Sequence, residues 1–344
     1  METINAGKWT VLARYQEKLR DNVVSCCLCP HNCLIHEGKQ GICQTRVNYK
    51  GVLYSIAYGN PCSVSIDPIE KKPLFHFLPG TKIYSLATAG CNFRCSNCQN
   101  WQISQTRPKS HDHYELLPEE VVKNAIIHET ESIAFTYTEP TVFYEYLYDT
   151  AITAHEEGLK TVIVSNGFIN KKPLLDLCPY LDAANIDLKC FNETIYLQLT
   201  GGRLQPVLDT LKTLKDSGVW LEITNLLVPG YSDIPEMILA MCDWLVGNGF
   251  ADTPLHFSRF FPTYKLSHLP PTAEHALIRA KDIAEKKGMK YVYIGNIPSL
   301  NGENTYCPAC KQMLVERNGY VVLKNLIHNG LCSICGEPVA GVWQ

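Results

Sequence analysis

Three closely spaced cysteines have the arrangement of a metal site. Cys91, Cys95 and Cys98 follow the pattern C-x3-C-x2-C. Three thiolates do not complete the tetrahedral shell of a structural zinc ion or of an ordinary four-thiolate cluster. A [4Fe–4S] cluster held by three cysteines leaves one iron open, and an open position is typical of catalytic metal sites. A zinc site with a distant fourth ligand is the alternative.

A second group of cysteines lies near the end of the chain and comprises Cys307, Cys310, Cys332 and Cys335. Two C-x2-C pairs separated by 21 residues predict a four-thiolate site, as in zinc ribbons. We expect zinc, with a rubredoxin-like iron or an auxiliary cluster as alternatives. The segment is too short to form its own core, so the metal should supply folding energy. Because the segment is not notably basic, we expect a structural or docking role rather than nucleic-acid binding.

A third group lies near the start of the chain and comprises Cys26, Cys29, Cys33 and Cys43. Four thiolates could hold either zinc or an auxiliary [4Fe–4S] cluster. His31 or His36 could replace one ligand, although each is more typical of a solvated loop. Cys27 adjoins Cys26 and cannot easily share one tetrahedral site with it, so we leave it out.

The composition limits the class of protein. The chain has 344 residues, of which 46% are hydrophobic and 19% charged, which predicts a globular protein of roughly two domains. The formal net charge of −3 argues against a protein that mainly binds nucleic acid. Sixteen cysteines without an export signal predict reduced thiols in a cytoplasmic protein. No apolar run is long enough to span a membrane.

The central part of the chain alternates between strands and helices. We expect strands at 82–90, 132–140, 159–167, 183–189, 219–230, 254–262 and 291–296. Helical segments are expected between these strands. They lie at 118–129, 141–158 and 171–180, after the strand 183–189 up to residue 218, from a cap at Ser232 or Asp233 to residue 246, and at 272–287. This α/β order predicts a partial (βα)6 TIM-like barrel, with a doubly wound sheet as the alternative. A barrel places its chemistry at the carboxyl ends of its strands.

The expected domains follow the cysteine groups. Residues 1–80 form a Cys-rich module, 81–300 the barrel and 301–344 the four-cysteine knuckle. Trp9, Leu12, Tyr15 and Leu19 have helical spacing and predict a short amphipathic helix. The polar segment 67–76 either forms a structured lead-in loop or covers the barrel mouth and contacts substrate.

The C-x3-C-x2-C motif after the first barrel strand resembles the signature of radical S-adenosylmethionine (SAM) enzymes. The resemblance implies that Cys91, Cys95 and Cys98 hold a [4Fe–4S] cluster whose open iron is chelated by SAM. It also implies reductive cleavage of SAM to methionine and a 5′-deoxyadenosyl radical, which abstracts hydrogen from a substrate.

Further positions resemble the SAM-binding residues of this family. Residues 136–140 stand where the family usually has Gly-Gly-Glu-Pro, and 165–167 resemble its Thr-Asn-Gly. Residues 186–189 and 227–233 are similar to motifs of glycyl-radical-enzyme activases. The implied SAM-binding residues are Thr138, Glu139, Ser165, Asn166, Asp187, Lys189 and Asn225, with 291–296 on the adenine side. Two residues depart from the pattern. Asn97 stands where many members of the family have an aromatic residue. Val164 stands where the activases have an Asp that belongs to a cation site.

The narrowest resemblance covers nearly the whole chain. Segments 27–33, 41–43, 67–76, 90–101 and 304–307 resemble the AmmeMemoRadiSam-system radical SAM enzymes, often described as pyruvate formate-lyase-activating-enzyme homologues. This implies Memo-like and AMMECR1-like partners, a flavodoxin-type or ferredoxin-type electron donor, and an unidentified small-molecule or protein side-chain substrate. The alternatives are an activase that installs a glycyl radical on a partner enzyme, and a non-catalytic zinc-dependent interaction or nucleic-acid-binding protein.

Overall fold

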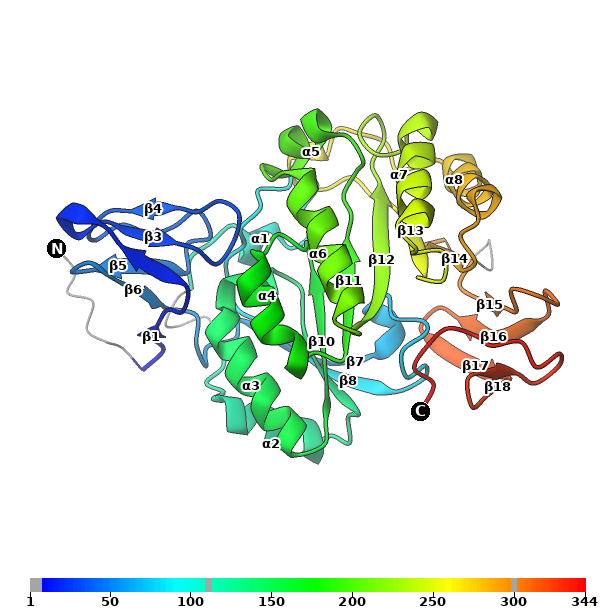
Figure 1. Ribbon diagram of the computed structural model, residues 1–344, viewed down its shortest axis with the longest axis horizontal. Helices are drawn as coiled ribbons and strands as arrows, with labels where there is room; N and C mark the ends of the chain where they lie inside the picture. The colour runs from blue at the N-terminus through cyan, green and yellow to red at the C-terminus, as the bar shows by residue number, and fades with distance from the viewer. Residues whose placement is uncertain (1–7, 109–112, 298–301) are drawn as a thin grey trace.

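The computed structural model describes residues 8–108, 113–297 and 302–344. Its centre is an eight-stranded sheet, which can be followed in Figure 1. The strand order is β14-β13-β12-β11-β10-β9-β8-β7, and every pair from β8 to β14 is parallel. A doubly wound sheet would reverse its strand order at a switch point. The sequential order therefore confirms a partial barrel of βα units. The strands are β7 (Ser63–Pro68), β8 (Lys82–Ala87), β9 (Ser132–Phe135), β10 (Lys160–Ser165), β11 (Ala183–Asp187), β12 (Trp220–Leu227), β13 (Leu255–Arg259) and β14 (Val292–Gly295).

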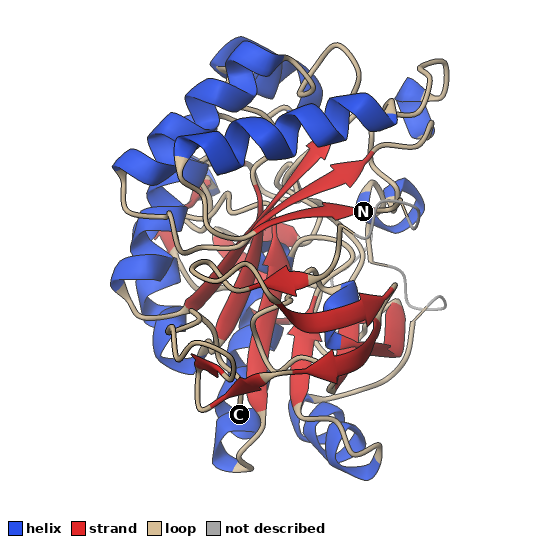
Figure 2. Ribbon diagram, turned by 90° about the vertical axis from the view of Figure 1, so that its right-hand side faces the viewer, coloured by secondary structure: helices blue, strands red, loops and turns tan. Residues whose placement is uncertain are grey.

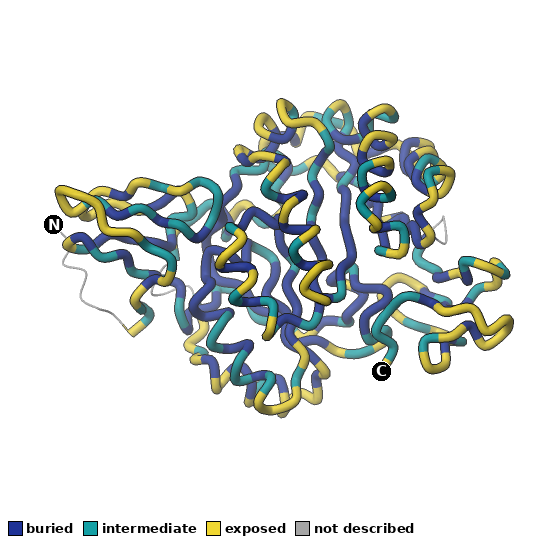
Figure 3. Tube along the Cα trace, viewed as in Figure 1, coloured by how far each residue is buried: buried dark blue, intermediate teal, exposed yellow. Residues whose placement is uncertain are grey.

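Helices cover the outer face of this sheet (Figures 1 and 2). In α6, the buried positions Leu204, Val207, Leu208, Leu211 and Leu214 recur at helical spacing and form one apolar stripe toward the strands. Figure 3 shows that the barrel strands are buried along most of their length. The helices are α1 (Trp101–Ser104), α2 (Pro118–Ile127), α3 (Tyr144–Glu156), α4 (Lys171–Leu177), α5 (Glu193–Thr200), α6 (Leu204–Asp216), α7 (Pro235–Gly247) and α8 (Glu274–Lys287), with short 3-10 turns at Arg20–Asn22, Ile69–Lys71, Pro140–Phe143, Cys178–Tyr180 and Tyr264–Leu266. Among the described residues, no helix is long and apolar enough to cross a membrane.

Helix α7 begins later than its expected cap. The residue before its first turn is Ile234, whose side chain makes no capping hydrogen bond. Ser232 Oγ instead accepts a hydrogen bond from Val228 N (2.7 Å), and Asp233 Oδ1 accepts one from Gly230 N (2.7 Å). Both side chains therefore stabilise the preceding turn, and the predicted cap is wrong.

The N-terminal module consists of two small antiparallel sheets. Their strands are β1 (Val11–Leu12), β6 (Val52–Ser55) and β5 (Arg46–Tyr49) in one, and β2 (Gln16–Lys18), β3 (Val24–Cys26) and β4 (Leu34–Ile35) in the other. The amphipathic helix predicted from Trp9 to Leu19 is wrong. Pairing with distant strands, such as Gln16 with Cys26, overrides the local spacing. The large sheet begins at β7, so it includes residues that the sequence assigns to this module.

The C-terminal module is built from short strands and lies beside the barrel at the end where the strands start. Its strands are β15 (Thr305–Tyr306), β16 (Met313–Asn318), β17 (Val321–Asn325), β18 (Ile327–His328) and β19 (Leu331–Cys332). The expected boundary between barrel and module, at residues 300 and 301, lies outside the described residues.

The segment before β8 closes this same end of the barrel. The backbone N–H groups of Phe75 and His76 donate to the Glu222 carboxylate at 3.0 and 2.8 Å, and Glu222 lies in the first half of β12. Arg317 of the C-terminal module donates to the Phe75 carbonyl at 2.7 Å. Phe75 and His76 therefore lie opposite the carboxyl ends of the strands. The expectation that this part of the segment covers the barrel mouth is wrong, because the buried Glu222 fixes it at the other end.

His76 should make the protein sensitive to mild acid. Its Nδ1 lies 2.6 Å from the Ala340 carbonyl oxygen and must donate to it, so Nε2 accepts from the Tyr293 hydroxyl at 2.5 Å. Burial lowers the pKa of His76 from 6.5 to about 4. Between these values the unfolded chain binds a proton that the folded chain does not. As pH falls from 6.5 to about 4, the free energy of unfolding should therefore decrease by about 3 kcal/mol through this residue.

Urea unfolding of the wild type and of His76→Gln, measured across that pH range, tests this expectation. Glutamine carries no titrating group, so the variant should lose most of the pH dependence. An unchanged dependence in His76→Gln would assign the effect to other residues.

Candidate active site

A cavity of about 250 Å³ opens at the carboxyl ends of the barrel strands. Cys91, Cys95 and Cys98 all line it, from the loop that follows β8. The loop is fixed by backbone hydrogen bonds to the end of α5, from Arg94 N to the Thr200 carbonyl (2.7 Å) and from Ser96 N to the Leu199 carbonyl (2.9 Å). The structure thus brings the three predicted ligands to one wall of one cavity.

The three sulfur atoms are spaced differently from those of the C-terminal cysteine group. Among the described residues they do not all approach within 4.8 Å of one another, as the C-terminal four do. In an iron–sulfur cluster each thiolate binds a different iron, which keeps the sulfurs apart. Burial raises the pKa of Cys91 well above its usual range and that of Cys95 to about 12. Metal binding at these thiols therefore has to displace protons.

An ion pair follows strand β11 on another wall. Lys189 Nζ lies 2.7 Å from Asp187 Oδ2, and both side chains line the cavity. Burial alone would lower the pKa of Lys189, but the Asp187 carboxylate and the nearby Cys95 raise it above its usual range. The pair offers one charge of each sign to a zwitterionic ligand.

Glu139 lies behind the cavity wall rather than in its lining. Its fully buried carboxylate accepts hydrogen bonds from Thr141 N (3.0 Å), Thr141 Oγ1 (2.7 Å), Ser165 Oγ (2.8 Å) and Asn166 N (2.8 Å). Burial raises the pKa of Glu139, and these donors counteract the shift. Glu139 and Ser165 therefore hold the turn after β10. Asn166 lines the cavity from that turn, and Thr138 lines it from the turn after β9.

Strand β12 turns different residues toward the cavity than the sequence suggested. Thr224 and Leu226 line it, whereas Asn225 lies between them and is directed away. Successive side chains of a strand point to opposite faces, so only one of these sets can face the cavity. Asn225 Nδ2 instead donates to the Leu188 carbonyl (2.6 Å), and its Oδ1 is buried without a partner. Ser258 of β13 and Asn296 after β14 also line the cavity.

Tyr137 is a lining residue that the sequence did not single out. Its backbone has φ of 61°, an uncommon conformation for an aromatic residue. Its hydroxyl donates to Asp67, and Lys72 Nζ lies 4.6 Å from the ring centre. Burial lowers the pKa of Lys72 to about 8. The pattern carried no signal for this contact, because residues 67 and 137 meet only through the fold.

The C-terminal four cysteines form a compact group. The Sγ atoms of Cys307 and Cys335 are 3.6 Å apart, those of Cys310 and Cys332 are 3.9 Å apart, and all four lie within 4.8 Å of one another. A tetrahedral ion with metal–sulfur bonds of about 2.3 Å would hold its sulfurs at about 3.8 Å. The group therefore fits one tetrahedral ion.

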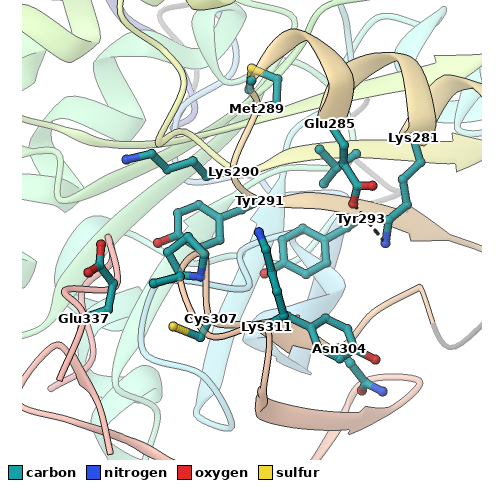
Figure 4. Close-up of a pocket in the computed structure, with 15 residues that line it drawn as sticks. Lys281, Glu285, Met289, Lys290, Tyr291, Tyr293, Asn304, Cys307, Lys311 and Glu337 are labelled. Atoms are coloured by element: carbon teal, nitrogen blue, oxygen red, sulfur yellow. Dashed lines mark ion pairs between the residues drawn. The ribbon is translucent and has the colours of Figure 1, made fainter. Parts of the chain in front are cut away.

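A larger cavity lies elsewhere, between α8 and the C-terminal module (Figure 4). Its volume is about 580 Å³, and Lys281 and Glu285 of α8 line it together with Lys311 and Glu337. Figure 4 shows side chains of both charges around it. It contains none of the cysteines at the barrel mouth, so the smaller cavity is the stronger candidate for chemistry.

Comparisons with known proteins agree with this arrangement. Residues 85–245 match the family model for the Radical SAM superfamily. An uncharacterized protein of Methanocaldococcus jannaschii, MJ0808, is 48% identical over 331 residues, which cover 95% of this chain and 98% of that protein. Pyruvate formate-lyase 1-activating enzyme of Escherichia coli K12 is 24% identical over 222 residues, which cover 59% of this chain and 89% of that enzyme. The crystal structure of Streptococcus suis SuiB bound to S-adenosylmethionine matches 70% of this chain and 56% of that chain, with 15% identity and a TM-score of 0.50, which supports the fold alone.

Proposed function

Because residues 85–245 match the family model for the Radical SAM superfamily, we propose that the chain is a radical SAM enzyme, that Cys91, Cys95 and Cys98 hold a [4Fe–4S] cluster and that SAM binds in the cavity beside them. The observation that carries this proposal is the meeting of three thiols and an Asp–Lys pair in one cavity at the carboxyl ends of parallel strands. Three cysteine ligands leave one iron for SAM. When bound, the cluster and SAM supply an electron and a 5′-deoxyadenosyl radical that takes a hydrogen atom from the substrate.

The polar side chains of the cavity would bind and orient SAM. Asp187 can accept hydrogen bonds from its ammonium or ribose hydroxyl groups, and Lys189 can pair with its carboxylate. The Thr138 hydroxyl donates to the Thr88 carbonyl (2.8 Å), which leaves its oxygen as an acceptor on the cavity wall. Glu139 acts as a positioning residue in this scheme, since its oxygens already accept four protein donors.

Asn166 connects the SAM side of the cavity to the cysteine loop. Its Nδ2 donates to Asn92 Oδ1 at 2.8 Å and lies 4.0 Å from Cys91 Sγ. Its backbone N–H is held by Glu139. We propose that this arrangement keeps Asn166 beside the first cluster ligand while Ser165 secures the turn.

We propose that the substrate is an unidentified small molecule or protein side chain. We also propose that the chain is an AmmeMemoRadiSam-type enzyme that acts with Memo-like and AMMECR1-like partners. The support is the combination of the barrel motif with cysteine modules at both ends of the chain. A flavodoxin-type or ferredoxin-type protein would supply the electron, and the C-terminal site would hold zinc. We also propose a reducing, cytoplasmic setting, in which the sixteen cysteines would stay thiols or metal ligands.

Activation of a glycyl radical enzyme is the second candidate. It is favoured by the likeness to pyruvate formate-lyase 1-activating enzyme and by a 25% identity over 222 residues to a putative glycyl-radical enzyme activating enzyme of M. jannaschii. These matches cover 59% and 62% of this chain, so they leave much of it without a counterpart.

Anaerobic reconstitution of the full chain tests the proposed function. Incubation with SAM and dithionite should release 5′-deoxyadenosine, measured by liquid chromatography and mass spectrometry. A colourless protein that binds only zinc and releases none would contradict the proposal and favour a non-catalytic zinc protein. Two further measurements separate modification of a substrate from activation of a glycyl radical enzyme. A deuterated substrate should transfer deuterium into 5′-deoxyadenosine. An activated partner enzyme should show a glycyl radical by electron paramagnetic resonance (EPR).

A further inference from the structure

The four N-terminal cysteines surround a cavity of their own. Cys26, Cys29, Cys33 and Cys43 line a space of about 20 Å³, whose walls include Leu28 and Ile35. Cys27 is outside this lining, and its sulfur lies 3.9 Å from the Ser25 hydroxyl and carbonyl oxygens. The fold therefore gathers the four cysteines that the sequence grouped and separates the fifth.

The sulfur spacing at this cavity differs from that of the C-terminal site. Among the described residues, no three of the N-terminal sulfurs lie within 4.8 Å of one another. One zinc ion would hold its four sulfur ligands about 3.8 Å apart. A [4Fe–4S] cluster keeps four sulfurs apart because each binds a separate iron. The cavity between separated thiols therefore favours a cluster over zinc.

A buried cation lies beside these thiols. The Arg46 side chain lines the cavity, is 1% exposed and has its Nη1 3.9 Å from Cys26 Sγ. Its Nη2 binds Glu145 at 2.5 Å, while its buried Nε–H has no hydrogen-bond partner. A cluster with four thiolate ligands carries net negative charge, which this guanidinium can offset.

The N-terminal cavity shares a wall with the cavity at the barrel mouth. Asn92 lines the first and Cys91 lines the second. His31 Nε2 lies 2.8 Å from the Asn92 carbonyl oxygen. Gly90 has φ of +108°, and a Cβ there would lie 2.7 Å from the Cys43 carbonyl oxygen, so the two chain segments pack in direct contact. A group bound in one cavity would adjoin a group bound in the other.

We propose that Cys26, Cys29, Cys33 and Cys43 hold a second [4Fe–4S] cluster that transfers single electrons to the cluster at Cys91, Cys95 and Cys98. A low-potential flavin or iron–sulfur protein loses one electron, the N-terminal cluster gains it and passes it on, and no covalent bond is formed or broken. The electron-transfer role rests on the proposed function, whereas the presence of the cluster does not.

Metal content of the full chain tests the cluster without any activity. The triple variant Cys91→Ala, Cys95→Ala, Cys98→Ala should retain about four irons per chain and an EPR signal after reduction. Adding Cys29→Ala to the triple variant should remove both the iron and the EPR signal. If the variant with Cys29→Ala folds poorly, Cys33→Ala takes its place. Cys27→Ala is the matched control and should retain them. A triple variant with no iron and a second zinc ion would overturn the proposal.

The electron-transfer role has a separate measurement. The rate of 5′-deoxyadenosine release is compared between reduced flavodoxin or ferredoxin and dithionite as the reductant. The ratio of the two rates should fall about tenfold in Cys29→Ala relative to Cys27→Ala, and an equal ratio in both variants would overturn the role. Absence of 5′-deoxyadenosine from the wild type would refute the proposed function, while the iron content would still decide the cluster.

Discussion

Replacing Cys95 by Ala is expected to reduce 5′-deoxyadenosine release by at least about a hundredfold and to remove the cluster at the barrel mouth. Cys95 lines the cavity, and it lies between the other two ligands in the sequence of the loop. Its loss leaves two thiolates for a cluster that needs three. The loop itself should persist, since its backbone hydrogen bonds from Arg94 and Ser96 do not involve this side chain.

Cys62→Ala is the matched control for this variant. Cys62 is half-buried, lies before the barrel strand β8 and belongs to none of the three cysteine groups. It should retain wild-type iron content and SAM cleavage. Iron that is retained in Cys95→Ala together with unchanged 5′-deoxyadenosine release would remove Cys95 from the site.

Replacing Cys307 by Ser is expected to release the C-terminal metal and to unfold the C-terminal module. Cys307 is fully buried, and few apolar side chains pack around it, among them Leu314, Val315 and Ile327. Metal binding contributes about 10–16 kcal/mol to the folding of small zinc modules, far more than so small a core can replace. The module should therefore lose protection against amide hydrogen exchange over residues 305–344.

The effect should extend to the barrel, because the module contributes to the barrel's closed end. Arg317 binds the Phe75 carbonyl, and the Leu78 N–H donates to the Val342 carbonyl at 2.7 Å. Zinc or iron content, hydrogen exchange and limited proteolysis measure the outcome. Ser333→Ala is the control, because Ser333 adjoins a ligand but its side chain is not part of the four-cysteine group. Unchanged protection of β16 after metal loss would contradict a structural role for the metal.

The local pattern of the sequence predicted much of the fold. Hydrophobic runs broken by Gly and Pro placed all seven parallel strands, because strand and helix formation depends on neighbouring residues. The three cysteine groups were also evident, since ligand spacing along a loop is itself a local property. The same reasoning failed at Trp9–Leu19, where pairing with distant strands outweighs the helical spacing.

The candidate site was predictable in its location but not in its lining. Parallel strands bring their carboxyl ends to one edge, so residues 91, 138, 166, 187 and 189 were expected together, and all five line the cavity. Side-chain direction depended on the pleat and on hydrogen-bond partners, which turned Asn225 and Glu139 away from it. Tyr137 entered the lining through its left-handed backbone and its contacts with Asp67 and Lys72.

The sequence alone determined which elements form and which cysteines belong together, because covalent spacing and hydrophobic period are properties of short segments. The tertiary structure decided what each cysteine group is suited to hold. The C-terminal sulfurs converge on one tetrahedral point, whereas the N-terminal sulfurs stand apart around a cavity beside Arg46. The distance between thiols and the charge that faces them depend on chain segments far apart in sequence, and only folding brings those segments into contact.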